Sequence, residues 1–130
     1  MRAVIPYFLK QENKGRIVNF CSTASIRGAA CGTAYTASKH ALLGLSRSTA
    51  WMYARELRCN SIILGPTAGT NITNTGKDPD KFGFERIQPY GNCLPAALTA
   101  EDIMPSLMHL LTAPGVNGAE LAVDNGFTTA

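Results

Sequence analysis

Two short apolar runs on either side of one long helical stretch constrain the fold of this chain most strongly. Residues 16–21 and 59–64 are short and mostly apolar, which is typical of strands buried in a parallel sheet. Between them, residues 33–57 carry small and apolar side chains at three- and four-residue steps, which is the spacing of a helix. Strand, helix and strand in this order predict a parallel βαβ unit and therefore an α/β fold.

The rest of the chain continues the same alternation. Thr99 can cap a helix over residues 100–111, and residues 119–124 have the composition of a third strand. Residues 4–10 are apolar and are expected to form the tail of a helix. Residues 65–83 are rich in Gly, Thr, Asn, Asp and Pro, so we expect a long loop there, and such loops are usually functional or mobile.

Composition excludes several classes of protein. With 130 residues, 45% hydrophobic and 16% charged, the chain is expected to be one soluble globular unit. It has no apolar run of about 20 residues, so no transmembrane helix is predicted. The net charge of +3 is spread along the chain and predicts binding neither to nucleic acid nor to a membrane surface. Four cysteines without a CxxC pair or a Cys/His cluster predict no metal site and favour a reducing, cytoplasmic setting.

Tyr35 and Lys39 are the candidate catalytic pair. They are four residues apart in the predicted long helix, so they lie on one face as neighbours. A cation beside a phenol lowers the phenol pKa from its usual value of about 10, which prepares the tyrosine for general acid–base chemistry. Ser22, at the end of the first predicted strand, precedes Tyr35 by thirteen residues and can bring a second hydroxyl to the same place. The structural alternative is an ordinary surface Tyr–Lys pair.

Residues 15–45 resemble the catalytic core of the short-chain dehydrogenase/reductase family, in which a serine, a tyrosine and a lysine follow at these offsets. The resemblance implies hydride transfer between NAD or NADP and a small-molecule carbonyl or alcohol. Tyr35 would then exchange the proton of the substrate oxygen, and Ser22 would hold that oxygen. Lys39 would activate Tyr35 and hydrogen-bond the nicotinamide ribose. The implied fold is the last three strands, with their helices, of a Rossmann-type doubly wound parallel sheet.

Two further segments resemble the family less closely. When the loop after the second strand is aligned with the family on Thr70, the resemblance places Ala68 against the nicotinamide carboxamide and Thr70 near the cofactor phosphates. The alternative for Thr70 is a loop threonine whose hydroxyl only satisfies its own turn. The loop has glycine before proline where the family has the reverse order. Residues 74–98 would form an apolar lid for a moderately hydrophobic substrate. Residues 124–127 resemble a closing motif, expected to be structural, in which Asn125 replaces a glycine.

The resemblance covers only the C-terminal half of the family. No glycine-rich turn after an opening strand is found, so the dinucleotide-binding N-terminal half is expected to be absent and the chain to be inactive alone. The alternative is a non-enzymatic remnant that associates with a full-length homologue. In the family the tyrosine-bearing helix packs against its copy, which predicts a homo-oligomer. A stripe of mostly small residues on this helix suits such packing: Ala34, Ala37, Ala41, Leu45, Ser48 and Met52. The substrate, the choice between NAD and NADP and the direction of the reaction stay open.

Overall fold

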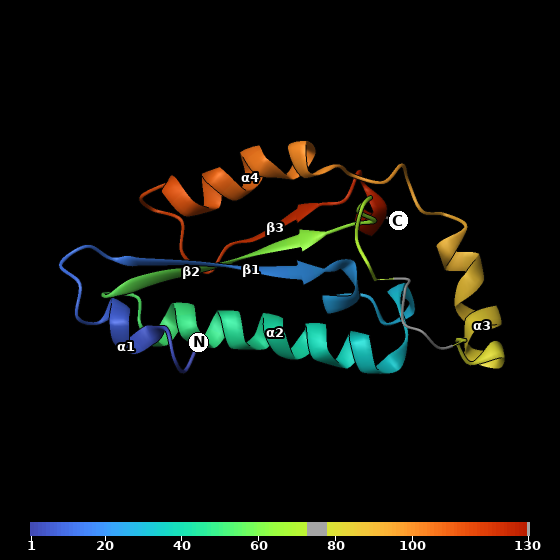
Figure 1. Ribbon diagram of the computed structural model, residues 1–130, viewed down its shortest axis with the longest axis horizontal. Helices are drawn as coiled ribbons and strands as arrows, with labels where there is room; N and C mark the ends of the chain where they lie inside the picture. Colours follow the sequence, from blue (N-terminus) through green and yellow to red (C-terminus); the bar gives the residue numbers. More distant parts are fainter. Residues whose placement is uncertain (73–77, 130) are drawn as a thin grey trace.

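A computed structural model describes residues 1–72 and 78–129, and its centre is a parallel sheet. The strands β1 (Gly15–Ser22), β2 (Leu57–Leu64) and β3 (Glu120–Val123) lie in that order, as Figure 1 shows. The predicted α/β class with a parallel sheet is therefore confirmed. Ser22 is paired with Leu64, so β1 and β2 end side by side at one edge of the sheet.

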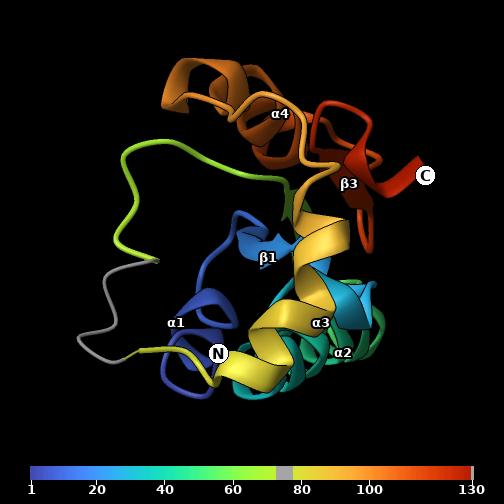
Figure 2. The ribbon, with the colours of Figure 1, turned by 90° about the vertical axis from the view of Figure 1, so that its right-hand side faces the viewer.

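Helices cover both faces of the sheet. In Figure 1, α2 (Thr33–Met52) runs along one face and α4 (Ala100–Thr112) along the other. The short α1 (Ile5–Phe8) lies near the start of β1, and α3 (Lys81–Gly91) lies beyond the carboxyl ends of the strands. Figure 2, which looks at those ends, shows α3 in front of the sheet. Among the helices of residues 1–72 and 78–129, none is long and apolar enough to cross a membrane.

The core has two main layers, because β2 is buried on both faces from its first residue to its seventh. On the side of α4, apolar side chains of β2 and α4 pack together with Leu98. On the side of α2, Leu43 packs with Cys21 and Ile63. A central strand covered on both faces is what the apolar run at residues 59–64 predicted.

The predicted end of the long helix was wrong by five residues. α2 ends at Met52, and residues 53–56 form a turn in which the Leu57 N–H donates to the Tyr53 carbonyl at 2.9 Å. This turn brings Leu57 opposite Gly15, so β2 begins two residues earlier than predicted. Helical spacing continued through the turn by chance, and strand pairing overrode it.

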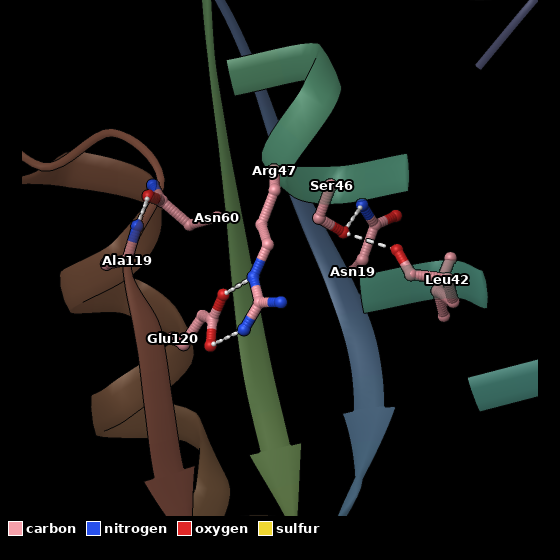
Figure 3. Close-up of polar contacts among 7 residues, drawn as sticks. All are labelled: Asn19, Leu42, Ser46, Arg47, Asn60, Ala119 and Glu120. Atoms are coloured by element: carbon pink, nitrogen blue, oxygen red, sulfur yellow. Dashed lines mark hydrogen bonds and ion pairs between the residues drawn. The ribbon is translucent and has the colours of Figure 1, made fainter. Parts of the chain in front are cut away.

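Polar side chains tie α2 to the sheet, as Figure 3 shows. Arg47 of α2 donates from both Nε and an Nη to the carboxylate of Glu120 on β3, the second contact at 2.9 Å. On β1, the Asn19 amide donates to the Ser46 hydroxyl at 2.7 Å. Asn60 accepts a hydrogen bond from the backbone N–H of the residue before β3. The contacts of Arg47 and Ser46 hold α2 against the strands, and the contact of Asn60 joins β2 to the start of β3.

The stripe of mostly small residues on α2 faces away from the sheet. All six of its members are exposed, whereas Leu43, Ser46, Thr49 and Ala50 are the buried residues of the helix. Leu45 and Met52, which are 46% and 66% exposed, place two large apolar side chains on this face. The helix therefore has one face packed on the sheet and a second, uncharged face left open.

Candidate active site

A cavity of about 730 Å³ lies at the carboxyl ends of β1 and β2, where ligands bind in open parallel sheets. Its size is within the range of small-molecule sites. Residues from both strand ends, α2, the loop after β2 and the C-terminal segment contribute to its wall. Ser22, Tyr35, Lys39 and Thr70 are among the lining residues. The predicted hydroxyls and the predicted cation are thus brought together in one cavity.

Ser22 is positioned by the turn that follows β1. Its Oγ accepts the backbone N–H of Ala24 at 3.1 Å, and its own backbone N–H donates to Ser25 Oγ at 3.2 Å, which together form a capping box. The side chain is half-buried. In the described part of the chain nothing accepts the Ser22 hydroxyl hydrogen. This hydrogen is therefore free to bind an acceptor in the cavity.

Tyr35 and Lys39 come from the first two turns of α2, and both are half-buried. The Lys39 ammonium donates to the carbonyl oxygen of Phe20 at 2.9 Å, which fastens the start of α2 to the end of β1. Its Nζ lies 5.5 Å from the centre of the Tyr35 ring. An ammonium at this distance from an aromatic ring is attracted to it. The two side chains are neighbours, as the four-residue spacing predicted.

The loop after β2 places its two predicted cofactor residues differently. Thr70 lines the cavity, while its hydroxyl donates to the Thr67 carbonyl at 3.2 Å, the turn contact that was the alternative interpretation. Ala68 is not among the lining residues, and its backbone N–H donates to the Leu98 carbonyl at 2.9 Å. Contacts of either residue with a cofactor remain predictions.

The order of glycine and proline in this loop has a steric cause. A Cβ added to Gly65 would lie 2.7 Å from the Asp124 Cα, closer than real Cβ contacts. The carbonyl of Pro66 accepts the Leu98 N–H at 2.8 Å. Glycine is needed where the chain leaves β2, because the segment after β3 passes directly against it.

Cys31 and Phe127 are two lining residues that sequence reasoning did not assign to the site. Cys31 was considered only as a reduced thiol. Phe127 was assigned to a structural motif, yet it is buried and lines the cavity. A usable signal existed for Phe127, because it follows a strand whose carboxyl end shares an edge with those of β1 and β2. Leu94, from the predicted lid, also lines the cavity, whereas residues 74–77 of that lid lie outside the described residues.

The four cysteines are free thiols, and two of them lie in the sheet. Cys21 is buried in β1 and Cys59 in β2. Burial raises the pKa of the Cys59 thiol from 9.0 to about 11. Within residues 1–72 and 78–129, no group of three His, Cys, Asp or Glu side chains is placed to hold a metal ion.

Residues 1–128 match the model of a protein family described as enoyl-(acyl carrier protein) reductase. Asnovolin H dehydrogenase of Aspergillus novofumigatus is 36% identical over 99% of the chain, and a short-chain dehydrogenase/reductase of Colletotrichum higginsianum is 38% identical over 98%. The chain belongs to the short-chain dehydrogenase/reductase family. It spans about half the length of these relatives, 54% and 50% respectively.

Solved structures of this family have the same fold. A protein of Agrobacterium tumefaciens described as a 2-deoxy-D-gluconate 3-dehydrogenase, with bound NADP, superposes with a TM-score of 0.75 at 27% identity. The superposition covers 99% of this chain and 52% of that protein. The three-stranded sheet is thus part of a Rossmann-type short-chain dehydrogenase/reductase fold.

Proposed function

We propose that this chain is the catalytic half of an NAD- or NADP-dependent oxidoreductase that interconverts a small-molecule carbonyl compound and its alcohol. Ser22, Tyr35 and Lys39 are its catalytic residues. The observation that carries the proposal is that all three, delivered by β1 and α2, line one cavity at the carboxyl edge of the sheet. A surface Tyr–Lys pair would have neither the half-buried setting nor a serine on the same wall.

The cavity has the chemistry to receive the nicotinamide end of such a cofactor. The Lys39 ammonium has three N–H donors, and one of them binds Phe20; within the described residues the other two have no partner. They are available to ribose hydroxyls, and Thr70, together with Ala68 of the same loop, would border the rest of the nucleotide. When bound, NAD or NADP supplies or accepts the hydride.

The protein groups handle the proton and the substrate oxygen. During reduction, the Ser22 O–H donates a hydrogen bond to the carbonyl oxygen, and Tyr35 gives that oxygen its phenolic proton. The Lys39 charge stabilises the tyrosine oxygen as it becomes negative. Oxidation of an alcohol uses the same groups in reverse, with Tyr35 taking the alcohol proton.

The substrate class follows from the remaining wall of the cavity. The cavity that Ser22 and Tyr35 line is also lined by three apolar residues, Leu94, Ala97 and Phe127. We therefore infer a moderately hydrophobic carbonyl or alcohol substrate. Free thiols at all four cysteine positions support a cytoplasmic setting for the reaction.

A chimera tests the proposal. In the chimera this chain replaces the half of asnovolin H dehydrogenase with which it aligns; the alignment covers 99% of this chain. The chimera is assayed for the dehydrogenase activity of that relative. Tyr35→Phe should lower kcat by at least about 100-fold, the usual contribution of a general acid or base. Tyr7→Phe, a change at an exposed tyrosine of α1, is the matched control and should leave kcat unchanged. A folded chimera without activity, or an active Tyr35→Phe chimera, would contradict the proposal.

We also propose that α2 pairs with the α2 of a second copy, which gives a homo-oligomer. The open face of α2 supports this, because Leu45 and Met52 expose apolar surface beside small residues that allow close approach. Leu45→Glu should shift sedimentation toward the monomer. Met108→Glu on α4, at a residue that is 47% exposed, is the matched control. An unchanged sedimentation coefficient in Leu45→Glu would contradict this assembly.

A second candidate function is a non-enzymatic remnant that associates with a full-length homologue. It is supported by β1, which pairs only with β2 among the described strands and leaves Phe20 47% exposed. We expect the isolated chain to be inactive and to bind a full-length family member. Turnover by the isolated chain, or no co-sedimentation with the full-length Aspergillus relative, would contradict this second function.

A further inference from the structure

The last residues of the described chain, 124–129, form a folded segment that we call the closing segment. The buried carboxylate of Asp124 accepts the backbone N–H groups of Gly126 at 3.0 Å and of Thr128 at 2.9 Å. Asn125 has a φ of 51°, a left-handed conformation that asparagine tolerates better than most residues. The closing segment therefore has a defined shape set by its own hydrogen bonds.

Three other parts of the site hold the closing segment from different sides. Arg27, in the loop after β1, donates to the Thr128 carbonyl at 2.7 Å. The Asn125 amide donates to the Ala96 carbonyl at 2.9 Å, a contact that a glycine at this position does not make. The ring of Tyr90, near the end of α3, packs on the ring of Phe127 with 4.6 Å between centroids. These contacts join the loop after β1 and the predicted lid through one short segment.

Phe127 is the member of the closing segment that reaches the cavity. It is 5% exposed and lines the same cavity as Ser22 and Tyr35. We propose that Phe127 is a specificity-determining residue, the rigid wall that limits the size of the substrate's apolar part. Arg27, Asn125 and Tyr90 are positioning residues for it. The inference rests on the proposed function in one respect, that the cavity is the substrate site.

The position of an aromatic ring decides how much bulk a pocket accepts. An aromatic side chain held on several sides cannot move aside for a larger ligand, because interiors are packed as densely as organic crystals. Hydrogen bonds between side chains and backbone carbonyls hold the chain at Asn125 and at Thr128, before and after Phe127, and the ring of Tyr90 packs on the ring of Phe127. Truncation of the ring enlarges the cavity that Ser22 and Tyr35 also line and removes neither of their hydroxyls.

Cys31 provides a test that needs neither cofactor nor turnover. Cys31 lines the cavity. Cys21 also lines it but is only 3% exposed, and Cys59 is buried, so the double change Cys21→Ser and Cys93→Ser leaves Cys31 as the accessible thiol in the folded chain. Rates of alkylation by iodoacetamide and by a bulky aryl maleimide are followed by mass spectrometry. Phe127→Ala should raise the bulky-to-small rate ratio several-fold. An unchanged ratio in folded Phe127→Ala protein would overturn the proposal.

Two matched variants keep the thiol test decisive. Phe82→Ala, at a phenylalanine of α3 that is 69% exposed, should leave the ratio unchanged. If Phe127→Ala does not fold, Cys59 becomes labelled as well, and Phe127→Leu replaces it. A ratio in folded Phe127→Leu equal to that of the parent would equally overturn the proposal.

The positioning residues have a separate readout. Arg27→Ala and Asn125→Ala should each raise the rate ratio by less than Phe127→Ala, and Arg27→Lys should restore part of the Arg27→Ala effect. Tyr90→Phe keeps the ring contact and should leave the ratio unchanged, whereas Tyr90→Ala should raise it. Equal ratios in the parent and in all three alanine variants would refute the assignment of positioning roles.

The chimera with the Aspergillus relative distinguishes this inference from the proposed function. With a small and a bulky cyclic ketone, Phe127→Ala should raise the bulky-to-small ratio of kcat/KM by about tenfold, the usual effect of pocket volume on discrimination. If the ratio is unchanged in Phe127→Ala while Tyr35→Phe still abolishes activity, the role of Phe127 in substrate size is refuted and the catalytic assignment is kept. If Tyr35→Phe stays active while the thiol ratio changes, the wall stands and the catalytic assignment fails.

Discussion

Gly65→Ala should destabilise the protein and disturb the site at the same time. The new methyl group would meet the Asp124 Cα at 2.7 Å and the Asp124 Cβ at 2.9 Å. The first of these is a backbone atom, so no rotation of a flexible side chain relieves the contact. Either the end of β2 or the start of the closing segment must move.

The size of the effect follows from the cost of overpacking. Extra methylenes in a packed interior cost about 1–3 kcal/mol, and a backbone neighbour places Gly65→Ala toward the upper end, at about 2–3 kcal/mol. With a urea slope of about 1–3 kcal/mol/M, the unfolding midpoint should fall by roughly 1 M or more. Circular dichroism in urea measures this midpoint, and the Cys31 alkylation ratio reports any displacement of Phe127.

Gly44→Ala is the matched control because a Cβ there meets nothing within 4 Å. Gly44 is exposed inside α2, where alanine is favoured over glycine by about 1 kcal/mol, so its midpoint should rise. The pair therefore has opposite expected signs for the same change of residue. A Gly65→Ala protein as stable as the parent, with Gly44→Ala stabilised, would refute the steric reasoning.

Three further predictions concern single polar groups. Because the pKa of Cys59 is raised from 9.0 to about 11 in the folded protein, its stabilising contribution is present below pH 9 and is lost as the pH rises toward about 11. The difference in urea midpoint between the parent and Cys59→Ala should therefore become smaller over this pH range. A difference that stays constant would contradict this. Hydrogen bonds from Thr99 lower the pKa of Asp102, so Asp102→Asn should lower the urea midpoint at neutral pH, where the carboxylate is charged. At a pH below the pKa of Asp102 in the folded protein, the two proteins should have the same midpoint. An equal loss at both pH values would contradict this. Asn60→Ala should lower the free energy of unfolding by about 3 kcal/mol, since its buried amide binds two carbonyls and an N–H; calorimetry with an unchanged melting temperature would disprove it.

The order of elements was predictable because it depends on local patterns. The apolar runs gave the strands, and Thr99 caps α4 as predicted, with its hydroxyl accepting the backbone N–H of Asp102. The end of α2 was not predictable from periodicity alone. Its last turn is set by the pairing of Leu57 with Gly15, a contact between residues far apart in the sequence.

The candidate site was predictable where spacing in one element determines geometry. Tyr35 and Lys39 are neighbours because of helical spacing, and Ser22 joins them because parallel strands end at one edge. For Phe127 the sequence gives only its place after a strand that ends at the same edge, which does not determine where the ring lies. Its place in the cavity wall depends on the fold of the closing segment and on Arg27, about a hundred residues away.

The register of β1 connects the fold to the chemistry. Side chains alternate between the two faces of a strand, so a slip of one residue would turn Ser22 away from the cavity and carry the Phe20 carbonyl away from Lys39. Two contacts oppose such a slip: the Asn19 amide donates to the Ser46 hydroxyl on α2, and the Lys39 ammonium donates to the Phe20 carbonyl at the end of the strand. Lys39 fastens α2 to β1 and also belongs to the proposed catalytic set. The position of Ser22 therefore depends on the same ammonium group that activates Tyr35 in the proposed reaction. Lys39→Met should therefore alter both the exposure of Ser22 and the catalytic step, whereas a purely catalytic lysine would leave the strand end unchanged.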